Sequence, residues 1–385
     1  MIASCVHSDR CGGCTYQGVD YEEQLAIKNA AVLEHLAEND VRCGEYAAIS
    51  PSPNITGYRN KMEYSFGNEV KDGEMTLGLY RRKSYMSVIE TDGCMIVTND
   101  YDVIRKSVLK YMRDACHTHR HKKTREGFLR NLVIRRGEMT GELLVNLVTT
   151  DAETLDSDSF VGMLLGLNLK DEIVGIIHTT YCGKSDTVAC DSMEVLHGRP
   201  YYYEEMLGLR YKVNAFAFFQ TNTAAVEKMF SDAFELLPDL YSKNVFDLYC
   251  GTGAISLSIA ENAGKVTGIE LVPDSILAAR ENAEINGISN CRFLEGDALE
   301  VMDSLPERPD IVCVDPPRMG MHPKALQKLI SYDLDEILYI SCNPKTFSFD
   351  MAVLQNNGYR LDYLKPYDNF PFTKHTELIS RIIKK

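Results

Sequence analysis

The chain has 385 residues, of which 45% are apolar and 25% are charged, and its formal net charge is −14. These values are typical of folded globular proteins and exclude a largely disordered chain, and the length suffices for two or three domains. No apolar run reaches the roughly 18 residues that a membrane-spanning helix needs, and no basic segment followed by an apolar one indicates a signal peptide. We therefore expect a cytoplasmic protein without a membrane partner.

The acidic balance argues only weakly against a nucleic-acid partner, because a local basic face can serve an acidic protein. Basic residues cluster at 81–83 (RRK) and at 117–125 (HTHRHKKTR). Each cluster alone is more typical of a solvated loop. The same interpretation applies to the three histidines of the second cluster, which could otherwise bind a metal ion.

Three of the twelve cysteines lie near the start of the chain, where Cys5, Cys11 and Cys14 form a C-x5-C-x2-C pattern. Structural zinc would need four ligands, usually in close pairs, and only Cys11 and Cys14 make such a pair. The two glycines between them match a redox CxxC pair poorly. Three clustered thiols with one distant partner suit a [4Fe–4S] cluster, and Cys94 is a candidate for the fourth ligand. Zinc and free thiols remain the alternatives.

The first half of the chain predicts an α+β domain over residues 1–212. Two segments, 21–38 and 98–115, have helical patterns. The other regular segments are rich in β-branched and aromatic residues, are joined by glycine-containing turns and are expected to form antiparallel strands: 57–67, 74–82, 85–90, 128–136, 142–150 and 173–180.

The second half, residues 213–385, alternates short strands with helices. The alternation predicts a mostly parallel sheet covered by helices on both faces, the α/β class, in which ligands bind beyond the carboxyl ends of the strands. The predicted strands cover 245–250, 265–271, 291–296, 310–315 and 336–341, and the predicted helices cover 253–264, 273–287 and 322–333.

Acidic or glycine residues follow four of these strands in succession. The first strand runs into a glycine turn, CGTG, that lets the backbone approach a ligand, and the next three end on a carboxylate. Single carboxylates at strand ends are often helix caps, but the whole series fits a binding site for S-adenosylmethionine. Its members are Gly251, Gly253, Glu270, Asp297 and Asp315.

Two further residues indicate covalent chemistry. Cys342 ends the fifth strand, over the expected ligand site, and a cysteine in that position is a candidate nucleophile. Glu377 lies near the C-terminus in the run HTEL. Taken alone, this glutamate would be interpreted as a surface residue.

The ordered runs DLYCGTGAISL, GIE, DPPRMG, SCNP and HTEL resemble those of the RNA uracil-C5 methyltransferases, bacterial enzymes that act on 23S rRNA or tRNA. The runs FFQTN, GYRNKMEYSFG and REGFLRNLVIRRG resemble further segments of this family, so the resemblance spans essentially the whole chain. It implies a class I, Rossmann-like S-adenosylmethionine-dependent domain preceded by an RNA-binding domain.

The resemblance also implies residue roles. Cys342 would add to C6 of uracil and Glu377 would remove the proton from C5, giving 5-methyluridine. The target base would leave its stack to reach the site. The cofactor would be lined by Gln220, Tyr249, Gly251, Gly253, Glu270, Asp297 and Asp315.

In the family members that carry an iron–sulfur cluster, the cysteine spacing is that of Cys5, Cys11, Cys14 and Cys94. Because tRNA-modifying relatives commonly lack a cluster, we expect 23S rRNA as the substrate, with the T-loop uridine of tRNA as the alternative. We also expect a monomer, without the N-terminal RNA-binding TRAM domain of many rRNA enzymes. A non-catalytic iron–sulfur RNA-binding protein is a further hypothesis, against which Cys342 and Glu377 together speak.

Overall fold

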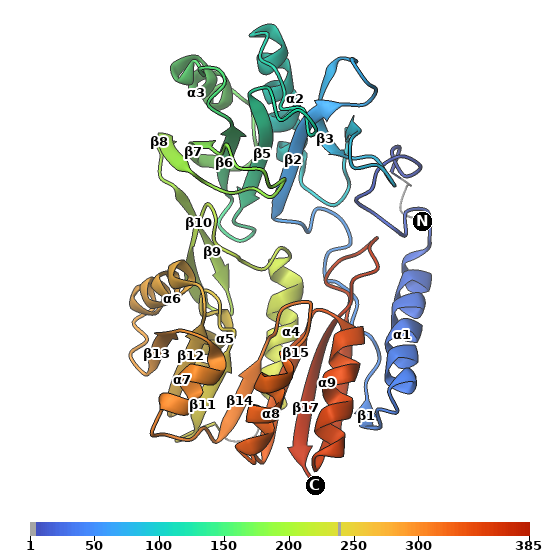
Figure 1. The fold of residues 1–385 in the computed structure, drawn as a ribbon, viewed down its shortest axis with the longest axis vertical. Helices are drawn as coiled ribbons and strands as arrows, with labels where there is room; N and C mark the ends of the chain where they lie inside the picture. The colour runs from blue at the N-terminus through green and yellow to red at the C-terminus, as the bar shows by residue number, and fades with distance from the viewer. Residues whose placement is uncertain (1–4, 238–239) are drawn as a thin grey trace. The chain divides into compact units, whose positions relative to one another are not determined.

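The computed structural model describes residues 5–237 and 240–385, and the chain divides into two compact units (Figure 1). Unit 1 comprises the described part of Met1–Val19 together with Asn54–Glu205 and Lys212–Phe216. Unit 2 comprises Asp20–Pro53, Met206–Tyr211 and the described part of Ala217–Lys385. The two units are described separately below.

The described part of unit 1 is built on a seven-stranded sheet with strand order β4-β3-β2-β5-β6-β7-β8. Most neighbouring strands are antiparallel, as predicted. The antiparallel prediction is wrong for β6 and β7, which run parallel because helix α3 (Ser157–Leu165) connects them and brings the chain back to the same end of the sheet. The strands are β2 (Lys61–Asn68), β3 (Met75–Tyr80), β4 (Val88–Glu90), β5 (Leu129–Arg136), β6 (Glu142–Thr149), β7 (Glu172–Thr180) and β8 (Ser192–Gly198).

Helix α2 (Asn99–Asp114) packs against β3 and α3 through one apolar face. Tyr101, Ile104, Val108 and Met112 recur at helical spacing on this face, and all four are buried. A small two-stranded sheet of β9 (Tyr201–Met206) and β10 (Leu209–Asn214) follows in the chain.

Unit 2 is built on an eight-stranded sheet with strand order β1-β16-β17-β15-β14-β11-β12-β13. The five predicted strands are parallel to one another, which confirms an α/β fold. Two strands near the C-terminus were not predicted, and β17 runs antiparallel to both β15 and β16. The strands are β1 (Cys43–Tyr46), β11 (Asn244–Leu248), β12 (Lys265–Glu270), β13 (Cys291–Glu295), β14 (Ile311–Val314), β15 (Glu336–Ser341), β16 (Tyr359–Tyr367) and β17 (Glu377–Lys384).

Seven helices of the described residues accompany this sheet: α1 (Tyr21–Glu38), α4 (Thr223–Glu235), α5 (Ala254–Ala260), α6 (Pro273–Ile285), α7 (Ala298–Ser304), α8 (Pro323–Ser331) and α9 (Pro344–Asn356). Helix α1 packs against α9, and β1 pairs in parallel with β16. Residues 20–53 therefore group with unit 2, whereas the sequence favoured a division of the whole chain at residues 212 and 213.

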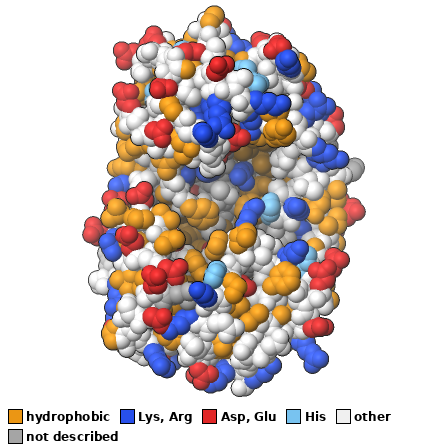
Figure 2. Space-filling model, viewed as in Figure 1, with side chains coloured by type: hydrophobic (Ala, Val, Ile, Leu, Met, Phe, Trp, Pro, Cys, Tyr) orange, Lys and Arg blue, Asp and Glu red, His pale blue; other side chains and the backbone are white. Residues whose placement is uncertain are grey.

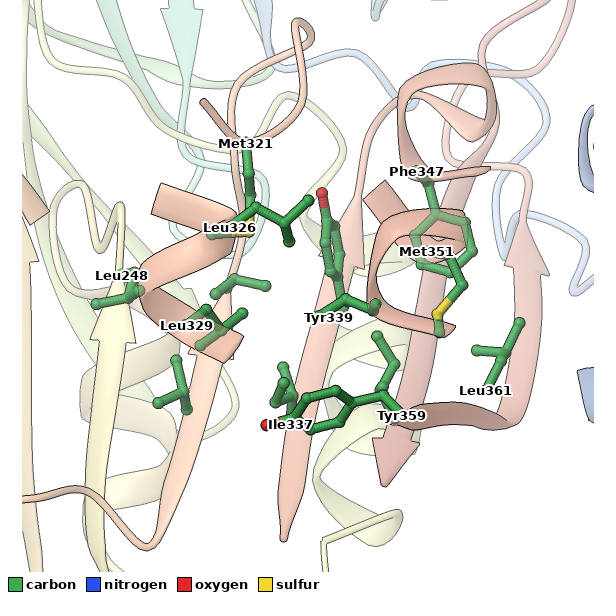
Figure 3. Close-up of a cluster of buried hydrophobic side chains, with 14 of the residues drawn as sticks. Leu248, Met321, Leu326, Leu329, Ile337, Tyr339, Phe347, Met351, Tyr359 and Leu361 are labelled. Atoms are coloured by element: carbon green, nitrogen blue, oxygen red, sulfur yellow. The ribbon is translucent and has the colours of Figure 1, made fainter. Parts of the chain in front are cut away.

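A large hydrophobic core lies between the unit 2 sheet and helices α1, α7, α8 and α9. Figure 3 shows Tyr339 of β15 between Leu326 of α8 and Phe347 of α9, with Ile337 of the same core further along the strand. Ile337 and Tyr339 are two positions apart in β15, so their side chains point to the same face of the sheet. This core fixes the carboxyl ends of β14 and β15, where the candidate site lies.

No helix in the described part of the chain is both long enough and apolar enough to cross a membrane.

Candidate active site

The antiparallel strand β17 brings Glu377 to the edge of the sheet where Cys342 lies. Ser341, the last residue of β15, pairs with Leu378 of β17. Because the two strands run in opposite directions, the residue after Ser341 is Cys342 and the residue before Leu378 is Glu377. Two residues that are far apart in the sequence thus lie side by side at the carboxyl end of the parallel strands.

Asp315 lies at the same edge, directly after β14, which is the neighbour of β15. Burial raises the pKa of Asp315 to about 7. Burial and the nearby Asp315 carboxylate raise the pKa of Glu377 to about 8, against the opposing effect of the Arg318 guanidinium. Burial, Glu377 and Asp315 raise the pKa of the Cys342 thiol to about 12, and Arg318 again opposes the shift. Near neutral pH the Cys342 thiol and most of Glu377 are therefore protonated, whereas Asp315 is close to half ionised.

Arg318 is an exposed residue that the sequence singled out only as the fourth position of DPPR. Its carbonyl oxygen accepts hydrogen bonds from Asn343 Nδ2 at 2.9 Å and from Thr346 Oγ1 at 3.4 Å. Asn343 also caps α9 by accepting from the backbone N–H of Lys345. The helix start after Cys342 therefore holds the loop that carries Arg318.

The backbone of the turn after β11 would let a ligand approach closely. Tyr249, Gly251 and Gly253 all have left-handed backbone conformations, with φ values of 66°, 54° and 86°. A Cβ atom on Gly253 would meet the Phe293 ring at 3.1 Å, so this glycine is required for packing as well as for its φ. A Cβ atom on Gly251 would project into open space. The two glycines thus serve different purposes, and only Gly251 borders free space.

Glu270 ends β12 with its carboxylate held in place. Its Oε2 accepts a hydrogen bond from the N–H of Gly251 at 3.2 Å, and its Oε1 accepts from the N–H of Val272 at 3.0 Å. Burial followed by the charges of Asp297, Asp350 and Glu270 raises the pKa of Tyr249. Glu270 and the exposed Asp297 thus both lie within electrostatic reach of Tyr249.

Gln220 is half-buried in the loop before α4. Asn222, two residues later, caps α4 by accepting from the N–H of Ala225, and its Nδ2 donates to the carbonyl oxygen of Asn369 at 2.8 Å. This segment is therefore tied to the loop that leads into β17.

Asp247 is an acidic residue of this region that the sequence interpretation did not single out. It is fully buried inside β11, where Ser256 Oγ donates to its Oδ2 at 2.5 Å, while its Oδ1 has no hydrogen-bond partner. Burial raises its pKa to about 7, and Asp315 and Glu270 add to the rise. An aspartate within the apolar run VFDLYC was the available signal, since a buried carboxyl in a strand is rare without a partner.

A separate candidate site in unit 1 contains the four predicted metal-ligating cysteines. Cys5, Cys11, Cys14 and Cys94 line one pocket together with apolar side chains such as Leu79 and Ile96. Burial raises the pKa of Cys94 to about 12, and the other three cysteines contribute to this rise. The four sulfur atoms therefore gather in one weakly solvated place, although Cys94 is far from the others in the sequence.

The loop that carries Cys11 and Cys14 is fastened to the end of β3. The N–H of Gly12 donates to the carbonyl oxygen of Tyr80 at 3.0 Å, and a Cβ atom on Gly12 would come within 3.0 Å of that oxygen. The side chain of Arg82 donates to the carbonyl oxygens of Ser8, Cys11 and Cys14. Glycine at position 12 thus permits the close approach, and Arg82 closes the loop around the pocket.

No three His, Cys, Asp or Glu side chains among the described residues are arranged to hold a single metal ion. A single zinc ion would need its sulfur ligands to converge about 2.3 Å from one point. A [4Fe–4S] cluster spreads its four thiolates over four iron atoms, so its ligands surround a larger volume.

Comparisons with known proteins identify the family to which this chain is similar. The family model described as tRNA (Uracil-5-)-methyltransferase matches residues 205–384. An RNA methyltransferase of Clostridium tetani is 42% identical over 383 residues, covering 100% of this chain and 84% of that protein. A second, from Caldanaerobacter subterraneus subsp. tengcongensis, is 42% identical and covers 99% of this chain and 84% of its own length.

The chain belongs to the RNA uracil-5-methyltransferase family. Among solved structures, the tRNA (uracil-54, C5)-methyltransferase of Pyrococcus abyssi in complex with S-adenosyl-L-homocysteine is similar with a TM-score of 0.79 and 27% identity. The match covers 97% of this chain and 86% of the Pyrococcus chain. As a member of this family, the chain is an S-adenosylmethionine-dependent RNA methyltransferase, and the hypothesis of a non-catalytic RNA-binding protein is set aside.

Proposed function

We propose that this methyltransferase converts a uridine of 23S rRNA to 5-methyluridine, with Cys342 as nucleophile and Glu377 as base. The observation that carries the proposal is the pairing of β15 with β17, which sets these two residues next to each other beyond the sheet edge. Uracil C5 is a weak nucleophile, so a thiol that adds at C6 and a carboxylate that accepts the C5 proton are the two groups that the reaction needs.

The acidic strand ends fit S-adenosylmethionine. Gly251 borders open space, the oriented Glu270 carboxylate has lone pairs left for two ribose hydroxyls, and Asp247, Asp297 and Asp315 add negative charge. Gln220 and Tyr249 would complete the lining. When bound, S-adenosylmethionine supplies an electrophilic methyl group and a positive charge, and that charge favours the ionised forms of the surrounding acids.

The residues act in an order that balances protons. Cys342 would give up its thiol proton to solvent as its sulfur forms a bond to C6, and the ring would become an enolate. C5 of the enolate would attack the methyl group, with S-adenosyl-L-homocysteine as the leaving group. Glu377, in its ionised form, then removes the proton from C5. The C6–S bond breaks, and Cys342 leaves as the thiolate and takes a proton back from solvent. The proton on Glu377 passes to solvent, so one proton is released in each turnover. Arg318 assists because its positive charge favours both the thiolate and the carboxylate.

We further propose that Cys5, Cys11, Cys14 and Cys94 hold a [4Fe–4S] cluster. The support is the shared pocket with its apolar wall, in which burial and the neighbouring thiols raise the pKa values of Cys11, Cys14 and Cys94. A bound cationic centre would favour the thiolates instead. Unit 1 would use the cluster as a structural part of its RNA-binding surface, since the cluster site and Cys342 belong to different units.

A second candidate substrate is the T-loop uridine of tRNA. It is favoured by the similarity to the Pyrococcus abyssi enzyme, whose description names uracil-54 of tRNA. The preference for 23S rRNA rests on the cysteine pattern.

The two substrates are separated by methylating unmodified transcripts of 23S rRNA and of tRNA with the purified protein and mapping 5-methyluridine by mass spectrometry. Product on 23S rRNA supports the proposal, and product on tRNA alone would contradict 23S rRNA as the substrate. Cys342→Ala should abolish the product, whereas Cys116→Ala, at an exposed cysteine of unit 1, should not change the rate. Turnover by Cys342→Ala at the wild-type rate would refute the covalent mechanism.

A further inference from the structure

Unit 1 contains a basic pocket that the proposed function does not use. The empty space of this pocket, including space open to solvent, is about 520 Å³. The lining includes Tyr80, His119, Arg120, Lys122, Arg130 and Asp186. The segment 117–125, which the sequence favoured as a solvated loop, therefore forms a wall of a pocket. Figure 2 shows Lys and Arg side chains gathered on the visible surface of this unit.

The residues that line the pocket carry more positive than negative charge. Arg120, Lys122 and Arg130 supply three positive charges, and Asp186 is the one carboxylate in the lining. The Arg120 side chain is only 6% exposed, yet its distance to Asp186 is 4.0 Å. Burial lowers the pKa of the Arg130 guanidinium, and the neighbouring Arg120 lowers it further. Two guanidinium groups so close together in a weakly solvated place favour an anion as an additional partner.

The cations of the pocket divide into structural and available groups. Arg130 donates to the carbonyl oxygens of Tyr181, Gly183 and Ser185, so it holds the loop before β8. Arg120 Nη2 also donates to the Gly183 carbonyl oxygen at 3.3 Å, and its Nη1 lies 4.0 Å from Asp186. Lys122 instead lies 4.0 Å from the centre of the Tyr80 ring and 3.1 Å from the exposed carboxylate of Asp186. An ion pair with an exposed aspartate is weak and exchangeable, so Lys122 can transfer to a stronger anion.

We propose that this pocket binds a phosphodiester group of the substrate RNA, with Lys122 and Arg120 as its cationic ligands and Asp186 as the group that the phosphate displaces. The proposal rests on the RNA substrate of the proposed function and adds a binding site outside the catalytic unit. Phosphate contacts position an RNA without reading its sequence, so the site would serve affinity rather than the choice of uridine.

The test uses opposite charge changes at one ion pair. Binding of wild type, Lys122→Gln and Asp186→Asn to the 23S rRNA and tRNA transcripts, and to a scrambled RNA of equal length, is measured without S-adenosylmethionine over a range of salt concentrations. Lys122→Gln should weaken binding to every RNA roughly tenfold and reduce the salt slope by about 0.7, the value for one lost contact to a single strand. Asp186→Asn should strengthen binding several-fold, and Lys122→Arg should retain wild-type affinity.

Both Lys122→Gln and Asp186→Asn break the same ion pair, so a merely structural role would move affinity in the same direction in each. That result, or unchanged affinity in both, would overturn the proposal. The matched control is the exposed pair Lys110–Asp114 on α2, where Lys110→Gln and Asp114→Asn should leave binding unchanged. If wild type binds the RNAs and Lys122→Gln binds them with the same affinity, only the phosphate site of the pocket is contradicted. A wild-type protein that methylates neither transcript contradicts the proposed function instead.

Discussion

Lys28 and Asp368 form an ion pair of 2.5 Å across 340 residues of the chain, and neither side chain is exposed. Lys28 also donates to the carbonyl oxygen of Phe370 at 3.0 Å, and Gln24, one turn earlier in α1, accepts from the N–H of Phe372 at 2.9 Å. Helix α1 therefore fixes the loop that leads into β17 and thus the position of Glu377.

We expect Lys28→Met to lower the free energy of unfolding by about 3–5 kcal/mol, because it leaves the Asp368 carboxylate buried without its cation. Urea unfolding at pH 7 measures the change. The double variant Lys28→Met/Asp368→Asn should recover a large part of the loss, since the unpaired charge is removed as well. Lys110→Met, at a pair whose side chains are 79% and 64% exposed, should change stability by less than about 1 kcal/mol. Equal losses in the two single variants would contradict the importance of burial.

Glu377 should set the pH dependence of catalysis. Its pKa is raised to about 8, so it is mainly protonated at pH 7 and cannot accept the C5 proton in that form. The value of kcat/KM, which reports the free enzyme, should rise with pH through about 8 as Glu377 ionises. Arg318→Gln removes a charge that lowers this pKa, so its profile should shift to higher pH. A wild-type profile that is flat from pH 6 to 8.5 would argue against Glu377 as the base.

Glu377 should also make stability depend on pH. Its folded pKa lies above its unfolded value, so its contribution to stability is complete below about pH 4.3 and is lost as the pH rises through about 8. Glu377→Gln cannot ionise. At pH 8 its free energy of unfolding, measured with urea, should exceed that of wild type by up to about 4 kcal/mol. The two proteins should converge near pH 4. A difference that is the same at both pH values would show that the shift of the pKa is not its cause.

Cys342 should react slowly with iodoacetamide, because burial and the carboxylates of Glu377 and Asp315 raise its pKa to about 12. Asp315→Asn removes one of these carboxylates and should increase the alkylation rate at Cys342 about threefold to tenfold at pH 8. Arg318→Gln should decrease it. Peptide mass spectrometry gives the rate at each cysteine, and Cys116 serves as the internal control. Changes of the same sign in both variants would indicate altered access rather than altered charge.

Arg82 should be required for stable occupancy of the cysteine site. Its side chain bonds three carbonyl oxygens of the loop that carries Cys11 and Cys14, so Arg82→Gln should loosen that loop. After anaerobic purification we expect iron and sulfide contents reduced by about half or more. Arg81→Gln, at the neighbouring exposed arginine, should keep wild-type contents. A wild-type protein that contains zinc and no iron would overturn the cluster itself.

Local patterns were sufficient to predict the acidic series of unit 2. Parallel strands that follow one another in the chain end at the same edge, so Glu270, Asp297 and Asp315 could be placed together from their positions alone. The helix over residues 21–38 was also predicted from its helical pattern, and Asp20 caps it in the structure.

Long-range pairing was not predictable in the same way. The proximity of Cys342 and Glu377 depends on β17 entering the sheet between β15 and β16, and strand pairing across the chain leaves no local signature. The parallel pairing of β6 and β7 and the association of α1 with α9 depend likewise on packing partners distant in sequence. Asp247 carried a local signal, as an aspartate within the apolar run VFDLYC, but its role depends on Ser256, Asp315 and Glu270, which only the fold brings near it.

The interleaved course of the chain has a consequence for dissection of the protein. Strand β1 covers the outer edge of β16 through the pairs Cys43–Leu361 and Glu45–Tyr363. A fragment that begins at residue 213 would lack this strand, expose a row of unpaired backbone groups along β16 and leave the Asp368 carboxylate without Lys28. Such a fragment would contain Cys342 and Glu377 and still tend to aggregate through its open edge, so the catalytic half is not a detachable module.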